Sequence, residues 1–369
     1  MVCGTVAAFL IPHSEFRIIP NSVSVCPRSG IDHLSGTAWA YVPPCSMALF
    51  TAFAFGPGID YLLKGFFIMP EVKPFHSGFV AIMGRPNVGK SSIMNALVGE
   101  KVAIVSDRPQ TTRNRIMGVV TQPEWQLVFV DTPGIHRPRT RLGEYMMKTA
   151  EQAMIGTDAL LCVVDGQYIG QTDLALLREW GQHKGYKILA INKIDLLNRE
   201  RLLTDIAQVC ELGFDEVVPI SAKTGEGMGA LLKLLVNALP EGPKYFPDDM
   251  YTDQPERFIA AEIIREKALL NLREEIPHGV GVEMLSMKQV GKNLCEIHAN
   301  IYCEKQSHKS IIIGKQGAML KKIGTEARID MENLLGSKIM LQLWVKVRED
   351  WRNKMGDLRT LGYDSTEEQ

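Results

Sequence analysis

Residues 84–92 read Gly84-Arg85-Pro86-Asn87-Val88-Gly89-Lys90-Ser91-Ser92 and fit the phosphate-binding loop pattern GxxxxGK[ST]. An apolar run at 79–83 predicts a buried strand before the loop, and residues 91–99 predict a helix after it. Glycines let backbone N–H groups turn toward phosphate oxygens, and the helix N-terminus adds partial positive charge. We therefore predict that Lys90 reaches the outer phosphates and that the Ser91 hydroxyl holds Mg²⁺. The predicted nucleotide contacts in the loop are Gly84, Asn87, Val88, Gly89, Lys90, Ser91 and Ser92.

The composition sets the frame for the remaining motifs. A chain of 369 residues predicts two or more domains, and a net charge of -1 means that any basic surface is local. The seven cysteines show no paired metal-type spacing. Cys162 and Cys210 fall in or near apolar segments and are expected to be free thiols, which suits a reducing cytoplasm.

The N-terminal segment, residues 1–68, differs from the rest of the chain. It has few charged residues and three of the seven cysteines. Its longest apolar stretch, 47–55, is broken by Gly56-Pro57-Gly58 and is too short for a transmembrane helix. We expect a segment without a fold of its own. The alternative is an extension that touches a membrane.

From residue 79 onward, predicted strands and helices alternate. This order predicts an α/β domain with a mainly parallel sheet and helices on both faces, and its ligand beyond the carboxyl ends of the strands. The predicted strands are 116–121, 126–130, 159–164, 188–191 and 217–220, and the predicted helices are 174–183, 201–212 and 228–239.

Four further motifs lie at or between these strand ends. They are Gln110-Thr111-Thr112-Arg113, Asp131-Thr132-Pro133-Gly134, Asn192-Lys193-Ile194-Asp195 and Ser221-Ala222-Lys223. Asp131 can bind Mg²⁺, and the Gly134 N–H can contact a terminal phosphate. Thr112, with Thr111 as the alternative, can complete the metal shell.

The Asp195 carboxylate can accept hydrogen bonds from the N1–H and the exocyclic amine of guanine, a donor pair that adenine lacks. Ser221, Ala222 and Lys223 can close over the base. The candidate metal ligands are Ser91, Thr112 and Asp131. All five motifs in this order predict an enzyme that binds and hydrolyses GTP, with GTP or GDP and Mg²⁺ as its cofactors.

Residues 78–240 resemble a translation-factor-class GTPase domain, and the motifs GRPNVGKS, QTTR, DTPGIH, NKID and SAKTGEG resemble the Era family. The resemblance implies catalytic roles for Asn87, Lys90, Thr112 and Gly134. Ile135 stands where many small GTPases carry a water-positioning glutamine, which implies slow hydrolysis. Asn87 matches an asparagine that coordinates K⁺ in related GTPases. The alternative is a loop residue bonded to its own backbone.

Beyond a Pro- and Gly-rich linker, the chain predicts a second, α+β domain. A helix at 257–275, strands at 281–290 and 293–302, a helix ending at 335 and a strand at 339–347 surround the segment 311–317. The expected division is 1–68 extension, 69–240 GTPase domain, 241–255 linker, 256–350 RNA-binding domain and 351–369 C-terminal tail.

The αββααβ order with GxxG between helices resembles the bacterial-type K-homology (KH) domain that closes Era proteins. Gly314 and Gly317 would let an RNA backbone approach closely, and Lys315 supplies charge. Ile312 and Ile313 are expected to form an apolar floor for bases, and Lys305 and Lys309 extend a basic patch. The predicted RNA contacts are Ile313, Gly314, Lys315, Gln316, Gly317, Lys321 and Lys322.

Two functions follow from these interpretations. The resemblance implies a cytoplasmic factor that binds 16S rRNA near its 3′ end and assists assembly of the 30S ribosomal subunit, with peripheral contact at the inner membrane and no transmembrane segment. The alternative is a membrane-associated signalling GTPase whose KH-like domain binds a protein or lipid surface. The lysines beside GxxG favour the first.

We also expect translation to begin at Met69, so that residues 1–68 are not normally made. The resemblance begins at Met69-Pro70-Glu71, and charged residues become denser there. Lys64-Gly65 is encoded by a purine-rich sequence at a workable distance upstream. Mass spectrometry of the endogenous protein tests this expectation, because abundant peptides from residues 17–28 would contradict it.

Overall fold

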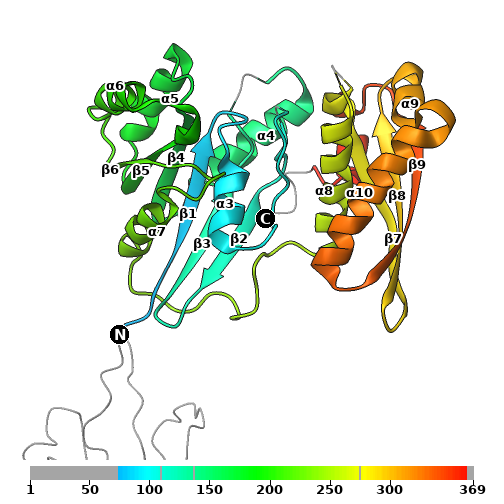
Figure 1. Cartoon of the computed structure of the whole chain (residues 1–369), viewed down its shortest axis with the longest axis horizontal. Helices are drawn as coiled ribbons and strands as arrows, with labels where there is room; N and C mark the ends of the chain where they lie inside the picture. The colour runs from blue at the N-terminus through cyan, green and yellow to red at the C-terminus, as the bar shows by residue number, and fades with distance from the viewer. Residues whose placement is uncertain (1–73, 109, 136–137, 274–275, 364–369) are drawn as a thin grey trace, which may run out of the picture. The chain divides into compact units, whose positions relative to one another are not determined.

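The computed structural model describes residues 74–108, 110–135, 138–273 and 276–363 (Figure 1). The predicted N-terminal extension and the Met69 start therefore lie outside the described residues. The other predicted elements are confirmed, with ends that shift by a few residues.

The first half of the described chain contains a six-stranded sheet in the order β2-β3-β1-β4-β5-β6. Only the β2–β3 pair is antiparallel within this sheet. The carboxyl ends of the parallel strands therefore meet at one edge, where the predicted motifs lie. The strands are β1 (His76–Gly84), β2 (Ile116–Thr121), β3 (Trp125–Asp131), β4 (Ala159–Asp165), β5 (Tyr186–Asn192) and β6 (Glu216–Pro219).

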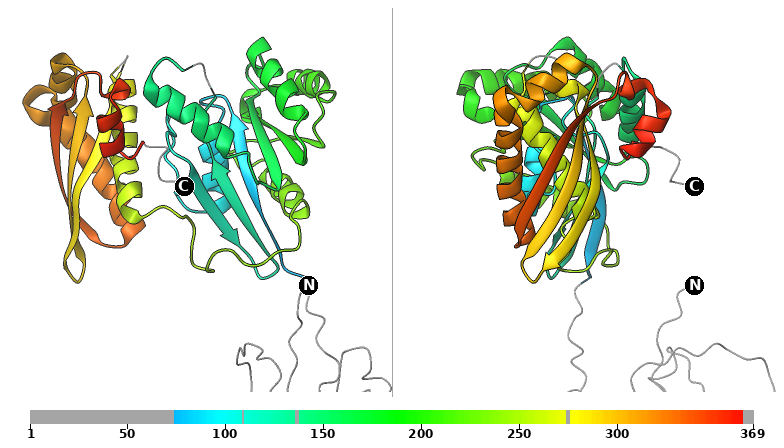
Figure 2. Two further views of the ribbon diagram at one scale, coloured as in Figure 1. Left: turned by 180° about the vertical axis from the view of Figure 1, so that it is seen from behind. Right: turned by 90° about the vertical axis from the view of Figure 1, so that its right-hand side faces the viewer.

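Helices cover both faces of this sheet (Figures 1 and 2). Alternate residues of β1 point to opposite cores: Val80 and Ile82 join the cluster with α3 and α7, whereas Ala81 and Met83 join the cluster with α5 and α6. Burial on both faces explains why these strands are continuous apolar runs. The helices are α3 (Lys90–Val98), α4 (Arg141–Gln152), α5 (Gln171–Gly181), α6 (Arg199–Val209) and α7 (Met228–Asn237).

Helix α4 was missed in the sequence analysis. Its N-cap is Thr140, whose side chain accepts a hydrogen bond from the Gly143 N–H at 3.2 Å. Leu142 and Met146 are buried on one side of the helix, while its other positions are largely polar. They pack against Trp351, Leu358 and Tyr363 near the C-terminus, a partner that no local pattern reveals.

The second half of the described chain contains the three-stranded sheet β7-β8-β9, which has α8 and α10 on one face (Figure 1). Helix α8 ends before the predicted residue 275 because Leu272 adopts an extended conformation. The elements are α8 (Glu256–Asn271), β7 (Gly281–Gly291), β8 (Leu294–Cys303), α9 (Gln306–Ile313), α10 (Ala318–Leu335) and β9 (Lys338–Val347).

Residues 351–363, part of the predicted tail, carry the 3₁₀ turn η5 (Trp351–Asn353) and helix α11 (Met355–Thr360). Trp351 is fully buried, and its indole Nε1–H donates to the Gly279 carbonyl at 2.9 Å. Within the described residues, no helix is both long enough and apolar enough to cross a membrane.

Candidate functional site

The loop between β1 and α3 has a backbone that only particular residues fit. Gly89 caps α3 with a φ of 100°, and a Cβ there would lie 2.2 Å from Asn192 Nδ2. A Cβ on Gly134 would lie 2.6 Å from the Pro86 backbone nitrogen. The predicted glycines are thus required both by conformation and by close approach of neighbouring loops.

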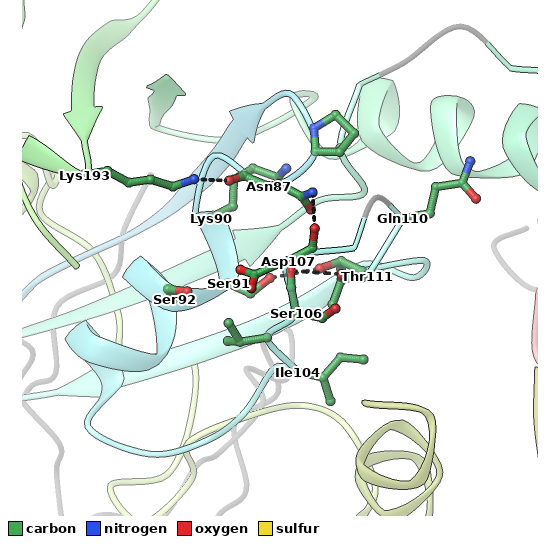
Figure 3. A pocket seen from close by; sticks show the side chains of 15 residues that line it. Asn87, Lys90, Ser91, Ser92, Ile104, Ser106, Asp107, Gln110, Thr111 and Lys193 are labelled. Carbon is green, nitrogen blue, oxygen red and sulfur yellow. Dashed lines mark hydrogen bonds between the residues drawn. The ribbon is translucent and has the colours of Figure 1, made fainter. Parts of the chain in front are cut away.

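Lys90 lies inside this loop (Figure 3). Its Nζ donates to the carbonyls of Gly84 at 3.1 Å and Arg85 at 3.2 Å. Burial lowers the pKa of Lys90 to about 8, although the nearby Asp131 carboxylate acts in the opposite direction. The ammonium group is therefore held by neutral carbonyls at the place where a phosphate would offer stronger acceptors.

Three oxygen-bearing side chains converge beside Lys90. Asp131 Oδ2 accepts from Ser91 Oγ at 2.6 Å and from Thr112 Oγ1 at 3.2 Å, and the two hydroxyls lie 2.9 Å apart. Within the described chain, Asp131 Oδ1 is buried without a hydrogen-bond partner. Burial raises the pKa of Asp131, and Lys90 opposes this rise. A hard divalent cation fits this set of donors and would satisfy the buried carboxylate.

A second group of side chains lines a pocket at the place where the base is expected. Asn192 joins two motifs, because its Nδ2 donates to the Val88 carbonyl at 2.8 Å and its Oδ1 accepts from the Ala222 N–H at 3.1 Å. Asp195 Oδ1 accepts from Ser221 Oγ at 2.7 Å. The pocket is lined by Gly89, Ser92, Asp107, Gln167, Asn192, Lys193, Asp195, Leu196, Ala222 and Lys223.

Lys193 closes one side of this region. Its Nζ donates to the Asn87 carbonyl at 2.9 Å (Figure 3). The same Nζ pairs with Asp165 Oδ2 at 2.6 Å. Asn87 itself has a φ of 65°, and its Nδ2 donates to the Asp107 carbonyl at 2.6 Å. The side chain of Asn87 therefore links the phosphate loop to residues 104–112, several of which line the same cavity.

Three residues of the segment after β3 are buried or packed against the core beside the phosphate loop. Thr132 is fully buried, and its hydroxyl donates to the Ile82 carbonyl at 2.7 Å, which ties the residue to β1. Pro133 is also buried. Ile135 packs against the core, and its N–H donates to the Gly84 carbonyl at 3.1 Å. No side chain that could orient water stands at this position.

The GxxG loop joins α9 to α10. Gly314 has a φ of 73°, and a Cβ there would lie 2.8 Å from the Met319 nitrogen. Gly317 has a φ of 80° and faces open space, while Lys315 and Gln316 are exposed. The adjoining groove, hereafter the GxxG groove, is lined by Gly317, Leu320, Lys321, Gly324, Thr325, Arg328, Ile339, Met340, Leu341 and Leu343.

One part of the RNA-site prediction is wrong. Ile312 is fully buried in the core of this domain and cannot offer a floor for bases. Ile313 is partly buried and packs against the same core, and the lining of the groove does not include it. The apolar residues that do line the groove are those of β9, together with Leu320 of α10. Lys322 does not belong to the lining of the groove, and its Nζ lies 3.8 Å from Glu326 Oε1.

Comparisons with known proteins agree with both halves of the structure. Residues 79–193 match the family model for 50S ribosome-binding GTPases, and residues 275–352 match the KH domain model. The chain is 55% identical over 293 residues to GTPase Era of Alkaliphilus oremlandii, which covers 79% of this chain and 99% of the relative. It is 53% identical over 294 residues to GTPase Era of Clostridioides difficile, with the same coverage.

The chain belongs to the Era family of GTPases. It is also similar to two solved Era structures, each at 39% identity with a TM-score of 0.75, and these cover 78% of this chain and 99% of the other. One is Era in complex with MgGDPNP and nucleotides 1506–1542 of 16S ribosomal RNA. The other is a single-residue variant of Aquifex aeolicus Era bound to GDP·AlF4⁻.

In this Era-family chain, the KH half contacts the loop that carries Thr112, a feature that sequence reasoning missed. Arg113 is almost fully buried, and its guanidinium donates to the carbonyls of Val280 at 2.8 Å and His278 at 3.2 Å. It also lies 5.6 Å from the centre of the Trp351 ring. Burial lowers the pKa of Arg113, so the surrounding rings and carbonyls stabilise a costly buried cation.

Helix α8 contacts the same loop from a second side. Arg265 is buried, pairs with Glu262 and donates to the Thr111 carbonyl. Glu266 accepts from the Val105 N–H at 2.9 Å and from Lys101 Nζ at 2.5 Å. Thr112 thus lies between two residues whose positions depend on the KH half. Charged residues on a helix normally face solvent, so the sequence carries no signal for these contacts.

Proposed function

We propose that this Era-family GTPase binds 16S rRNA near its 3′ end and assists assembly of the 30S ribosomal subunit. The observation that carries the proposal is the GxxG groove, with Lys321 at its side and an apolar lining from β9. A solved relative, which this chain matches over 99% of the relative's length, holds nucleotides 1506–1542 of 16S rRNA. KH domains clamp single-stranded RNA at such a loop, with glycines against the backbone.

We propose the following roles in the nucleotide site. Lys90 and the Gly134 N–H contact the outer phosphates, while Ser91, Thr112 and Asp131 hold Mg²⁺. The metal would neutralise charge on the phosphates, which is its usual contribution to phosphoryl transfer. Asp195 selects guanine, and Ser221, Ala222 and Lys223 close over the base. Lys193 and Asn192 hold the phosphate loop and the base loop together through the hydrogen bonds given above.

Slow intrinsic hydrolysis is part of the proposal. Ile135 offers no group to orient the attacking water, so the rate depends on electrostatic stabilisation in the phosphate loop. We propose K⁺ as a second cation beside Asn87. The competing observation is the hydrogen bond from Asn87 Nδ2 to the Asp107 carbonyl, which gives this side chain a purely structural task. Hydrolysis faster in K⁺ than in Na⁺ at matched ionic strength is expected, and identical rates would leave only the structural task.

We propose the domain division given in the sequence analysis, with the GTPase domain ending near residue 240 and the KH domain beginning near 256. The bounds of α7 and α8 support it, because residues 238–255 between them contain no helix. We place the protein in the cytoplasm, where its rRNA partner is found.

Crosslinking of the protein to RNA in cells, followed by sequencing, tests the proposal. We expect reads concentrated at the 3′ end of 16S rRNA, and their loss when Gly314 and Gly317 are both replaced by Asp, since the added side chains would distort the loop and their carboxylates would repel phosphates. Reads spread over unrelated RNAs would contradict the proposal. So would binding to lipid vesicles or to a protein without RNA, which is the result expected of a membrane-associated signalling GTPase.

A further inference from the structure

Along the edge strand β9, one face of the KH sheet carries no helix of the described chain (Figure 2, right). On β9, burial alternates: Ile339, Leu341, Leu343 and Val345 are directed to the helices, and the positions between and beside them are directed outward. The outward positions form what we call the β9 row: Lys338, Met340, Gln342, Trp344 and Lys346. All five are exposed, and they include a tryptophan and a methionine.

Trp344 is the centre of this row. It is 42% exposed, and its ring meets that of His298 on the neighbouring strand edge-to-face, with 5.4 Å between centroids and 82° between planes. His298 is itself held by Glu296, whose Oε1 lies 2.9 Å from Nε2. The indole is therefore oriented by a neighbouring ring while part of it stays exposed. An exposed, pre-oriented aromatic ring is the feature on which unpaired bases stack.

The charge around Trp344 favours a polyanion. Lys338 and Lys346 stand at the two ends of the β9 row, and Lys288 lies on the same open face of β7. The acidic side chains of this face are engaged locally, with Glu296 held by His298 and Glu283 accepting from Tyr302 Oη at 2.6 Å. A protein partner would more often meet an aromatic residue inside an apolar patch, whereas here the nearest outward positions are lysine, amide and imidazole.

The β9 row also adjoins the GxxG groove. The sheet order places β9 at the edge, and Met340 belongs both to the row and to the lining of the groove. At a rise of about 3.3 Å per residue, Trp344 lies roughly 13 Å along the strand from Met340. A KH loop holds only about four nucleotides. A strand leaving the groove over the edge of β9 would therefore reach the row within a few nucleotides.

We propose that the β9 row is a second contact surface for single-stranded RNA, which continues the GxxG groove and stacks a base on Trp344. The inference rests on the proposed function in that the groove holds the first part of the same RNA strand. Lys338 and Lys346 contact phosphates on either side of the stacked base. The open face of the KH sheet thereby lengthens the RNA site beyond what the GxxG loop alone can hold.

The test compares RNAs of two lengths. Synthetic RNAs from the 3′ end of 16S rRNA are made as a six-nucleotide piece that fills the groove and as fourteen-nucleotide pieces extended on either side. For Trp344→Ala, we expect unchanged affinity for the short RNA and a loss of roughly 5- to 100-fold for the long RNA extended on one side. Trp344→Phe keeps a ring and should recover most of the loss. Val290→Ala, which trims another exposed apolar side chain of this sheet, is the matched control.

The possible outcomes distinguish a failure of the proposed function from a failure of the β9 row as an RNA surface. If the full-length protein fails to bind even the short RNA, the proposed function fails. If it binds the short RNA and Trp344→Ala binds both long RNAs as tightly as the parent protein, the β9 row is not an RNA surface. Loss of a ribosomal protein contact in Trp344→Ala, with RNA affinities unchanged, would likewise overturn the inference. An equal thermal midpoint for parent and variant checks that the sheet is intact.

Discussion

The phosphate loop and the GxxG loop use the same backbone device in opposite settings. Each ends in a glycine of left-handed conformation that caps a helix, Gly89 before α3 and Gly317 before α10. A Cβ on Gly89 would lie 2.2 Å from Asn192 Nδ2, whereas one on Gly317 meets nothing within 4 Å. One loop is enclosed by its neighbours and the other stands open to solvent.

The difference follows from what each site must recognise. In the enclosed site, Asp131, Thr132 and Asn192 are buried, and their side chains are hydrogen-bonded to α3, to β1 and to the phosphate loop, so a single ligand geometry fits. In the open site, exposed lysines lie beside an apolar groove, a combination that tracks a backbone of variable sequence. The comparison predicts sharp, large effects for changes in the first site and graded, smaller effects in the second.

The largest expected effect concerns Asp195 in the enclosed site. Hydrogen bonds to a charged group contribute about 1.5–3 kcal/mol each, so loss of two with Asp195→Asn predicts a GTP affinity lower on the order of 100- to 10,000-fold. The amide can donate where the carboxylate could only accept, so affinity for xanthosine triphosphate should rise. Titrations with GTP and with xanthosine triphosphate measure this change in preference. Equal GTP affinity in parent and variant would contradict the role of Asp195.

Arg113 tests whether the enclosed site depends on the KH half. Arg113→Ala removes a buried side chain and leaves the carbonyls of Val280 and His278 without their donor. We expect the free energy of unfolding to fall by about 2–4 kcal/mol. Retention of Mg²⁺-GTP should weaken as well, because the adjacent Thr112 loses its anchor. Denaturant titration and nucleotide dissociation rates measure the two effects. Arg199→Ala, an exposed arginine on α6, is the control and should change neither.

Much of the enclosed site was predictable because its chemistry restricts residue types at fixed places. Phosphate binding needs glycines before a helix, guanine selection needs a carboxylate, and parallel strands bring their carboxyl ends to one edge. The structure accordingly brings Ser91, Thr112 and Asp131 within hydrogen-bond distance of one another. Asp107, which receives the Asn87 amide on its backbone carbonyl, was not predicted because any residue type can serve there.

The residues that escaped prediction depend on tertiary packing. The run Ile311-Ile312-Ile313 has no polar position to show its register, and only the structure shows that Ile312 faces the core while Ile311 is exposed. Arg113 and Arg265 look like surface charges in the sequence, yet both are buried where a helix and a loop from distant parts of the chain meet. The outward side of β9 required knowledge of which face the helices cover.

The open loop should respond in a graded way. Replacing both Lys315 and Gln316 by Asp places like charge against phosphate, and we expect RNA affinity to fall on the order of 10- to 100-fold, with a weaker salt dependence. Binding of 16S rRNA fragments at several salt concentrations measures both. Replacing Lys233 and Asn237 of α7 by Asp gives the same change in charge on an exposed face elsewhere and is the matched control. Normal RNA binding by the Lys315 and Gln316 double variant would contradict the assignment of the GxxG groove as the RNA site.

The smallest expected effect concerns an ion-pair cluster between the GTPase half and the KH half of the chain. Asp330 of α10 pairs with Lys101, which follows α3, at 2.7 Å and with Lys267 of α8 at 2.6 Å. Burial alone would raise the pKa of Asp330, but hydrogen bonds from Lys101 and Lys267 outweigh it and lower the pKa below its ordinary value. The contribution to stability is therefore present above the unfolded-state pKa and is lost as the pH falls through the lower folded-state pKa.

Partial exposure of these side chains screens the interaction, so Asp330→Asn should reduce the free energy of unfolding at neutral pH by only about 0.5–1 kcal/mol. The reduction should shrink as salt is added and vanish in acid, once the parent carboxyl is also protonated. Denaturant titrations at neutral and acidic pH measure it, with Asp249→Asn in the exposed linker as the control. A loss that persists unchanged in acid would show that Asp330 acts by packing and not by charge. In that case the link between α10 and the loop after α3 would be steric, and salt would leave it intact.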